Sequence, residues 1–311
     1  MTEGMTLAAL LARDRPVVLD GGLATELESR GYDLTDGLWS ARLLRDDPGA
    51  IEDAHVAYLQ AGAEVIITAS YQASIESFAR SGMPAERAEE MLTRSVELAR
   101  RARGRVAEVE PRVAGALVAA SVGPYGAMLA EGQEYTGDYG ALTAEELEAF
   151  HERRLRVLVA AEPDCIACET IPRADEAGIL AGVLDRLAAP PAWISFTCRD
   201  GEATSHGEPI EVAVEAATSG DSVVAVGVNC TAPEHVPELL RRAATVTDLP
   251  LIAYPNSGRV WDGNERGWLT LGSDRLALDA VAEWVDAGAR LVGGCCGIGP
   301  AAIGEIADAY R

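Results

Sequence analysis

The sequence predicts an α/β protein folded as a (β/α)8, or TIM-type, barrel. First, short apolar or β-branched runs alternate with longer amphipathic segments along almost the whole chain. Strands that alternate with helices form right-handed βαβ units and a parallel sheet. Second, eight such runs occur, which is the number that closes this type of barrel. Third, polar residues directly follow most of the runs, where the C-terminal face of a barrel carries its functional groups.

The expected strands are short and evenly spread through the sequence. They cover residues 16–20, 64–68, 113–121, 164–169, 192–198, 223–229, 251–254 and 290–294. Four of the intervening segments show clear 3.6-residue apolar spacing, namely residues 51–60, 87–103, 145–160 and 276–285. No linker, low-complexity tract or change in composition divides the chain, so residues 1–311 are expected to form a single domain.

Charge and composition exclude several classes of function. The formal net charge of −23 argues against nucleic acid and anionic membranes as partners, because both bind basic patches. All 26 basic residues are arginine, which excludes Schiff-base aldolases, pyridoxal-phosphate enzymes and lysine-dependent phosphate loops. The sequence contains no apolar run of the roughly 18 residues that a membrane span needs, and its charged beginning does not resemble a signal peptide. A cytoplasmic protein that acts on small molecules is therefore expected.

Two expected loops are long enough to cover the C-terminal face of the barrel. Residues 31–48 follow the first strand, and residues 123–142 follow the third strand and are rich in glycine, tyrosine and acidic residues. Loops after the strands carry the binding residues in such barrels, so both loops are candidate lids. Plain surface loops are the alternative.

Three of the six cysteines are candidate metal ligands. Cys295 and Cys296 are adjacent, so in a regular strand they would face opposite ways. The glycines on both sides free the backbone to turn, which would let both sulfur atoms converge. The sixth strand ends two strands away from the eighth, so Cys230 could supply a third thiolate. Three thiolates suit Zn²⁺ and leave one tetrahedral position open for catalysis; three inert buried thiols are the alternative.

The other three cysteines are expected to be buried structural thiols. Cys165 and Cys168 form a C-x-x-C pattern, which elsewhere indicates redox chemistry or zinc. Here the pattern lies inside an expected strand, where residues three apart face opposite sides and cannot share a metal. Cys198 ends the fifth expected strand and is assigned to the core.

A metal held by three thiolates favours S-alkylation over hydrolysis. Metal binding deprotonates a thiol substrate that takes the fourth position, which makes it a nucleophile at neutral pH. Three anionic ligands keep electron density on the substrate sulfur and weaken the metal as a Lewis acid. Attack on a soft electrophile, such as an activated methyl group, is the reaction expected of this site.

Candidate substrate-binding residues lie at the strand ends and in the loops. Asp20 ends the first strand, and Glu169 ends the fourth, where it would point inward while Ile166 and Cys168 point outward. Two carboxylates at the barrel mouth could bind the ammonium group of an amino acid, act as a general acid–base pair, or form structural salt bridges. Aromatic faces would attract a sulfonium donor, and the loop aromatic residues are Trp39, Tyr71, Tyr125 and Trp261.

At these positions the chain resembles the homocysteine S-methyltransferase family over nearly its whole length. The distant Cys230 together with the Gly-Gly-Cys-Cys ending is the most specific feature. The matching segments are residues 19–27, 38–41, 68–73, 121–126, 167–170, 228–230, 254–258 and 293–296.

The resemblance implies a function and a set of site residues. Zinc would be bound by Cys230, Cys295 and Cys296, and the thiolate of homocysteine would fill its fourth position. Asp20 and Glu169, with Thr68, would hold the amino acid end of homocysteine. The full set of expected substrate-binding residues is Asp20, Thr68, Glu169, Asn229, Trp39 and Tyr71.

The resemblance also narrows the choice of methyl donor. The single-barrel length and the segments Ala69–Ala73 and Tyr254–Gly258 are most similar to those of enzymes that use S-methylmethionine, with S-adenosylmethionine as a weaker donor. Relatives often carry Arg-Thr-Thr-Pro after the cysteine pair, whereas this chain has Gly297-Ile298-Gly299-Pro300. The contact made by that arginine is absent here, which bears on the donor more than on the metal.

Four rival interpretations remain. Two are methyltransferases of a different type, one that uses betaine and one that methylates selenocysteine. A metal-dependent hydrolase or lyase would need histidine ligands, yet the chain has only four histidines and almost none near a strand end. A zinc-storing or thiol-sensing protein would fill all four metal positions with its own thiolates.

Overall fold

The computed structural model describes residues 5–34, 39–258, 260–262, 267–269 and 276–311. Eight parallel strands form one sheet in the order β1-β10-β7-β6-β5-β4-β3-β2. A parallel bridge between Leu19 and Val65 joins β1 to β2 and closes the sheet into a barrel. The strands are β1 (Val17–Val18), β2 (Val65–Ile67), β3 (Leu117–Val122), β4 (Cys165–Ile171), β5 (Ala192–Phe196), β6 (Val223–Asn229), β7 (Leu251–Tyr254) and β10 (Ala289–Val292). The predicted (β/α)8 barrel is confirmed.

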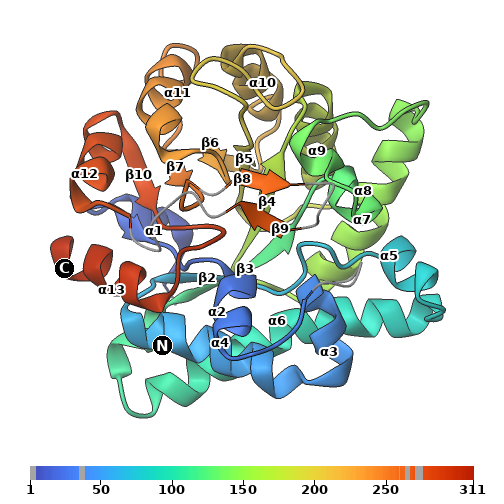
Figure 1. Cartoon of the computed structure of the whole chain (residues 1–311), viewed down its shortest axis with the longest axis horizontal. Helices are drawn as coiled ribbons and strands as arrows, with labels where there is room; N and C mark the ends of the chain where they lie inside the picture. The colour runs from blue at the N-terminus through green and yellow to red at the C-terminus, as the bar shows by residue number, and fades with distance from the viewer. Residues whose placement is uncertain (1–4, 35–38, 259, 263–266, 270–275) are drawn as a thin grey trace.

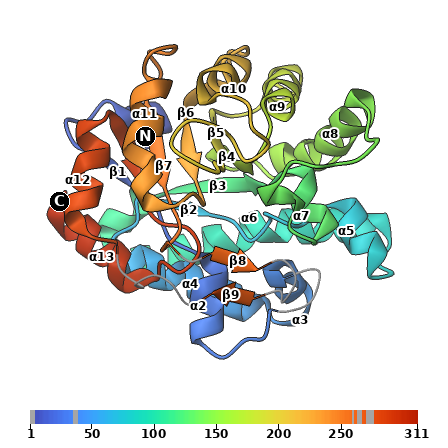
Figure 2. The same cartoon turned by 45° about the horizontal axis from the view of Figure 1, so that its top comes forward.

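Helices form a ring around the strands (Figure 1). In both views α10 and α11 lie on one side of the strands, while α4 and α6 lie on the opposite side (Figure 2). The helices are α1 (Leu7–Leu11), α2 (Leu23–Ser29), α3 (Leu43–Asp46), α4 (Pro48–Ala61), α5 (Ile75–Arg80), α6 (Ala85–Ala107), α7 (Tyr125–Leu129), α8 (Ala144–Ala160), α9 (Ala174–Arg186), α10 (Ile210–Ala217), α11 (Val236–Ala243), α12 (Leu278–Asp286) and α13 (Pro300–Ala309). The four segments predicted from apolar spacing lie within or largely within α4, α6, α8 and α12. No helix in these described ranges has the length and apolar character that crossing a membrane requires.

The third and fifth strands differ from their predicted bounds. The apolar pattern predicts that the third strand begins at residue 113. Instead, Pro111–Gly115 forms a short 3-10 helix, η2, and β3 begins only at Leu117. Proline at the first helical position presets the backbone for a helical turn, and this outweighs the apolar pattern. The pattern extends the fifth to residue 198, but β5 ends at Phe196, and Cys198 pairs with Thr204 in an isolated antiparallel bridge.

Both loops expected to act as lids contain short helices. Residues 31–48 include the 3-10 helix η1 (Trp39–Arg42) and α3, and residues 123–142 include α7 and the 3-10 helix η3 (Gln133–Tyr135). A separate antiparallel pair, β8 (Val260–Asp262) with β9 (Gly267–Leu269), follows β7 and lies outside the barrel sheet.

Apolar side chains fill both faces of the barrel strands. Alternate strand residues such as Leu117, Ala167 and Trp193 form the interior cluster, and Leu7 and Leu10 of α1 belong to it. The intervening strand residues pack outward against the helices. Because both faces are buried, the strands are almost continuously apolar. Polar groups that line a cavity are therefore expected at the strand ends and in the loops that follow them.

Gly227 of β6 provides a test of this packing. A Cβ atom at this position would lie 2.1 Å from the carbonyl oxygen of Ile252 in β7, and backbone atoms of a sheet cannot move apart locally. We expect Gly227→Ala to lower the free energy of unfolding by about 3 kcal/mol or more. Gly104→Ala is the matched control, because that Cβ would meet nothing within 4 Å on exposed α6 and should raise stability by about 0.5–1 kcal/mol. Denaturant titration measures both, and equal effects would contradict the packing argument.

Candidate active site

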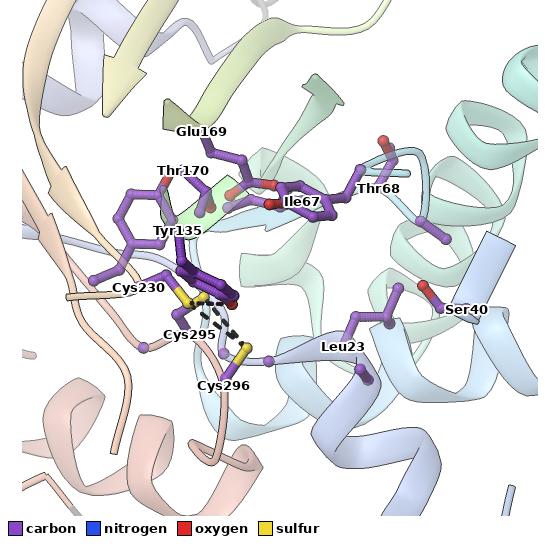
Figure 3. A pocket seen from close by; sticks show the side chains of 17 residues that line it. Leu23, Ser40, Ile67, Thr68, Tyr135, Glu169, Thr170, Cys230, Cys295 and Cys296 are labelled. Atoms are coloured by element: carbon purple, nitrogen blue, oxygen red, sulfur yellow. Dashed lines mark hydrogen bonds between the residues drawn. The ribbon is translucent and has the colours of Figure 1, made fainter. Parts of the chain in front are cut away.

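The sulfur atoms of three cysteines meet at the C-terminal ends of β6 and β10. The Sγ atom of Cys296 lies 3.8 Å from that of Cys230 and 3.9 Å from that of Cys295, and all three lie within 4.8 Å of one another. Four ligands at a zinc–sulfur distance of about 2.3 Å place sulfur atoms roughly 3.8 Å apart in a tetrahedron. The predicted convergence of the three thiols is confirmed, and their spacing fits a single metal ion (Figure 3).

The backbone after β6 adopts an unusual conformation to present Cys230. This residue has a φ of 46°, in the left-handed region that residues other than glycine rarely adopt. Its amide donates to the carbonyl of Tyr254 at 3.2 Å, and its own carbonyl accepts from the side-chain amide of Asn256 at 3.3 Å. Backbone strain of this kind persists only where the surroundings hold it. Here the segment after β7 does so.

The same segment holds the cysteine pair. The amide of Cys295 donates to the carbonyl of Pro255 at 2.8 Å, and the amide of Ser257 donates to the carbonyl of Cys296 at 2.9 Å. In the sheet order β7 separates β6 from β10. The residues after β7 therefore join the two cysteine-bearing strand ends, which explains the Tyr254–Gly258 segment singled out in the sequence.

Glycine permits the tight turn that brings the pair together. A Cβ atom at Gly294 would lie 2.2 Å from the side chain of Ile298, so only glycine fits there. Gly297, the first residue after the cysteine pair, has a φ of +82°, and its amide donates to Thr25 Oγ1 at 2.8 Å. A hydrogen bond from the main chain to the Thr25 side chain thus helps to fix the turn after the cysteine pair.

The three thiols compete for one negative charge. Hydrogen bonds from the Cys295 and Cys296 thiols lower the pKa of Cys230, and the resulting Cys230 thiolate raises the pKa of both partners. The phenol of Tyr135 lies 3.6 Å from Cys230 Sγ and keeps its proton, because burial raises its pKa. A divalent cation would relieve this competition by ionising all three thiols.

A buried carboxyl group faces the same cavity. Glu169 is 8% exposed and accepts a hydrogen bond from the hydroxyl of Ser121. Burial raises its pKa to about 7, against the opposing effect of hydrogen bonds from Ser121 and Tyr254. As expected from the alternation in β4, Ile166 and Cys168 belong to the outer cluster.

Asp20 lies behind the cavity wall. One of its oxygens accepts from the amide of Ile67 at 2.8 Å, and the other is buried without a hydrogen-bond partner. Burial, together with the charge of Glu169, raises its pKa well above the usual range. Within the described part of the chain neither carboxyl group has an arginine or histidine partner, so a structural salt bridge is not their role.

Asn229 does not line the cavity but connects two strand ends. Its side-chain oxygen accepts from the amide of Thr170 at 2.6 Å and from Ser195 Oγ at 2.8 Å, and its amide group donates to Thr170 Oγ1 at 2.8 Å. Thr170 is held in the left-handed region, with a φ of 61°. Asn229 therefore fixes the backbone that presents Glu169 and Cys230.

The cavity combines these groups with apolar walls (Figure 3). Thr68 and Tyr71, both expected from the sequence, line it together with three residues that sequence reasoning left unassigned, Tyr135, Thr170 and Tyr254. Tyr135 and Tyr254 lie in segments that the sequence did single out, as a lid loop and a strand end. Its lining residues are Gly21, Gly22, Leu23, Ala24, Ser40, Ile67, Thr68, Ala69, Tyr71, Tyr135, Glu169, Thr170, Cys230, Tyr254, Gly294, Cys295 and Cys296.

Three aromatic candidates from the sequence remain, namely Tyr125, Trp39 and Trp261. Tyr125 is absent from the cavity lining and packs its ring against Tyr139 and Phe150. The side chains of Trp39 and Trp261 lie outside the described part of the structure.

The other cysteines take no part in the site. Cys165 belongs to the barrel interior and Cys168 to the outer cluster, so the C-x-x-C pair faces opposite sides of β4 as predicted. Cys198 packs in the outer cluster too, and burial raises the pKa of all three thiols. They are structural thiols, as expected.

Fold and site together define a (β/α)8 barrel whose cavity opens on three cysteines with the spacing of a metal site. The family model described as homocysteine S-methyltransferase matches residues 17–310. The chain belongs to the homocysteine S-methyltransferase family and is thus an enzyme of the methyltransferase class.

Named relatives span the full barrel. The chain is 47% identical over 305 residues to homocysteine S-methyltransferase 4 of Zea mays, covering 94% of this chain and 89% of that protein. It is 43% identical over 307 residues to homocysteine S-methyltransferase of Escherichia coli (strain K12), covering 98% and 99%. The crystal structure of the homocysteine methyltransferase MmuM from Escherichia coli in its metallated form superposes with a TM-score of 0.88 at 42% identity, covering 97% and 99%.

The metal centre is tested by removing one thiol. Loss of an outer-shell partner typically weakens metal binding by about 10–100-fold. We expect Cys230→Ala, which removes a direct ligand, to weaken binding of a divalent metal by about 100-fold or more, while the barrel stays folded. Cys168→Ala removes a fully buried thiol from the outer cluster and should retain stoichiometric metal. Elemental analysis after dialysis and circular dichroism measure the two properties, and metal retention by Cys230→Ala would contradict the assignment.

Proposed function

We propose that this protein transfers a methyl group from a sulfonium donor to the thiol of L-homocysteine, forming methionine, with Zn²⁺ at the three-cysteine centre. S-Methylmethionine is the proposed main donor and S-adenosylmethionine a weaker one. The proposal rests on one observation above all: three thiols with tetrahedral spacing line the same cavity as a buried carboxyl group. The names of relatives that are 43–47% identical support homocysteine as the acceptor.

Zinc is the metal that this donor set favours. Cysteine thiolates are soft ligands that select zinc over magnesium, calcium or manganese. When bound, Zn²⁺ would supply one open coordination position at which a substrate thiol loses its proton. The phenol of Tyr135 lies 3.6 Å from Cys230 Sγ, and its hydrogen bond lowers the pKa of that thiol.

The acidic groups suit the ammonium end of an amino acid. Glu169 lines the cavity, and Asp20, directly behind the wall, adds a second buried carboxyl group. Thr68 accepts from the amide of Ser121 at 3.0 Å and shares a hydrogen bond of 2.7 Å with Ser70, so its side chain is fixed at the cavity edge. A cation that enters the cavity provides the counter-charge that these carboxyl groups lack within the protein.

The cavity walls favour the transfer itself. An electron pair of the homocysteine thiolate forms a bond to the methyl carbon, and the old carbon–sulfur bond breaks with its electrons left on the donor sulfur. A negative thiolate and a positive sulfonium thereby become two neutral thioethers, a change that apolar walls such as Leu23, Ala24 and Ile67 assist by excluding water. The aromatic rings of Tyr71 and Tyr135, which line the cavity, would attract the sulfonium, and fixed positioning of both substrates would supply much of the acceleration.

A donor and acceptor panel tests the function. We expect methionine from homocysteine with S-methylmethionine, a lower rate with S-adenosylmethionine, no product with betaine, and loss of activity with a chelator that Zn²⁺ restores. Selenocysteine is included as an acceptor because a relative from Brassica oleracea var. italica, 42% identical over 306 residues, is named selenocysteine Se-methyltransferase. Preference for selenocysteine over homocysteine would reassign the acceptor, and no methyl transfer with any pair would refute the proposal.

The pH dependence tests the role of Glu169. Its pKa of about 7 means that the carboxylate is ionised above pH 7 and protonated below, whereas the substrate ammonium stays protonated up to about pH 8. The KM for homocysteine should therefore rise roughly eightfold from pH 7.5 to pH 6, following the ionised fraction.

Glu169→Gln is the control for this profile. The amide keeps the shape of the side chain but carries no charge, so its KM should be high and independent of this ionisation. Titration of the substrate thiol affects both proteins alike, so the difference between the two profiles reports on Glu169. Parallel profiles would show that Glu169 does not bind the ammonium group.

A further inference from the structure

A buried carboxylate outside the cavity holds the loop of residues 123–142. Glu176 lies in the first turn of α9 and is completely buried. Its Oε1 accepts from the amide of Tyr125 at 2.7 Å, and its Oε2 accepts from the phenol of Tyr139 at 2.6 Å. These two tyrosines lie on either side of Tyr135, the residue that contacts Cys230. One side chain thus fixes the loop on both sides of its active-site contact.

Arg154 balances the charge of Glu176, and the neutral ring of His151 connects the two side chains. Arginine can only donate, so Nδ1 of His151 accepts from the Arg154 guanidinium at 2.8 Å, and the proton on Nε2 is donated to Glu176 Oε1 at 2.8 Å. Burial lowers the pKa of His151 to about 4, which keeps the ring neutral. Arg154 also donates to the carbonyl of Gly123, the first residue of the loop. The three side chains are all buried, two of them completely.

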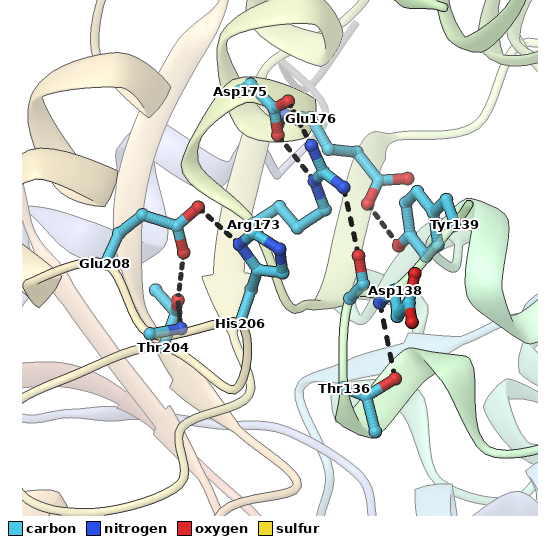
Figure 4. Close-up of polar contacts among 11 residues, drawn as sticks. Thr136, Asp138, Tyr139, Arg173, Asp175, Glu176, Thr204, His206 and Glu208 are labelled. Carbon is cyan, nitrogen blue, oxygen red and sulfur yellow. Dashed lines mark hydrogen bonds and ion pairs between the residues drawn. The ribbon is translucent and has the colours of Figure 1, made fainter. Parts of the chain in front are cut away.

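A second contact from α9 holds the middle of the loop (Figure 4). Arg173 donates to the carbonyl of Gly137 at 3.0 Å, and its guanidinium lies 5.2 Å from the ring centroid of Tyr139. Asp175 accepts two hydrogen bonds from Arg173, at 2.8 and 2.6 Å, and so fixes its direction. The start of α9 is therefore the platform on which the loop rests.

Close packing within the loop connects its anchored residues to Tyr135. A Cβ atom at Gly126 in α7 would lie 2.5 Å from the backbone of Gln133 and Glu134, so α7 and η3 touch through their main chains. Tyr135 is the last residue of η3. The platform itself continues from β4, which carries Glu169 and Thr170. β4 and the start of α9 thus form one continuous segment, which positions both the 123–142 loop and the Glu169 side chain.

We propose that Glu176 is a positioning residue, which clamps the 123–142 loop at Tyr125 and Tyr139 and thereby keeps the Tyr135 phenol against Cys230. An ion pair that served only the stability of the core would require no hydrogen bonds to the loop, yet both oxygens of Glu176 receive one. The inference builds on the proposed function only in its effect on methyl transfer. Its structural part concerns the protein's own residues and is tested without substrates or metal.

The sharpest variant is Tyr139→Phe, which removes one loop contact and leaves the buried charges paired. Glu176→Ala, by contrast, leaves Arg154 without its counter-charge in the core and risks unfolding. In metal-free protein, Cys230 is 4% exposed, so its alkylation by iodoacetamide should be slow. Loss of a buried hydrogen bond should raise that rate about tenfold in Tyr139→Phe, as followed by mass spectrometry of the Cys230 peptide. Amide hydrogen exchange should rise within residues 123–142 only.

Two matched variants complete the experiment. Tyr310→Phe makes the same chemical change just beyond α13 and should leave alkylation and exchange unchanged, whereas Tyr135→Ala removes the covering ring and sets the upper limit of the Cys230 rate. Wild-type rates in Tyr139→Phe, or faster exchange throughout the barrel, would overturn the clamp. With substrates, kcat/KM of Tyr139→Phe should fall about tenfold. If the wild type transfers no methyl group, the proposed function fails while alkylation still decides the clamp.

Discussion

The approach of three thiols to within 4.8 Å of one another is the constraint around which this protein is organised. Thiols this close share one ionisation, and hydrogen bonding lowers the pKa of Cys230 while it raises those of Cys295 and Cys296. A divalent cation removes the conflict. To bring the sulfurs together, the chain accepts a left-handed Cys230 and a glycine-only turn beside Cys295. Backbone contacts from the segment after β7 hold both.

The electrostatics of the cavity complement that centre. Asp20 and Glu169 are buried, lack cationic partners in the described part of the chain, and have raised pKa values. With the Cys230 thiolate beside them, the cavity favours positively charged groups over anions. An amino acid ammonium and a sulfonium are both cations, so one field serves both proposed substrates. The apolar walls then favour a step in which the reacting charges cancel.

Local rules made much of this predictable. Short apolar runs between amphipathic segments located all eight barrel strands. Residues three apart in a strand face opposite sides, which was enough to separate Cys165 from Cys168 in β4. The order of a parallel barrel placed the ends of β6 and β10 on either side of β7, which brought Cys230 to the cysteine pair. The predicted bounds failed where a local signal opposed the pattern, as when the 3-10 helix that begins at Pro111 took up the first residues predicted for the third strand.

The sequence by itself determined the barrel, the three cysteines and the acidic strand ends, because each follows from the period of a strand or the order of a sheet. Tertiary structure decided what contacts them. Asn229 faces Thr170 instead of the cavity, Tyr135 meets Cys230 from a loop 95 residues away, and Glu176 secures that loop from α9. These contacts depend on the angles at which loops leave their strands, and side-chain packing among distant segments sets those angles.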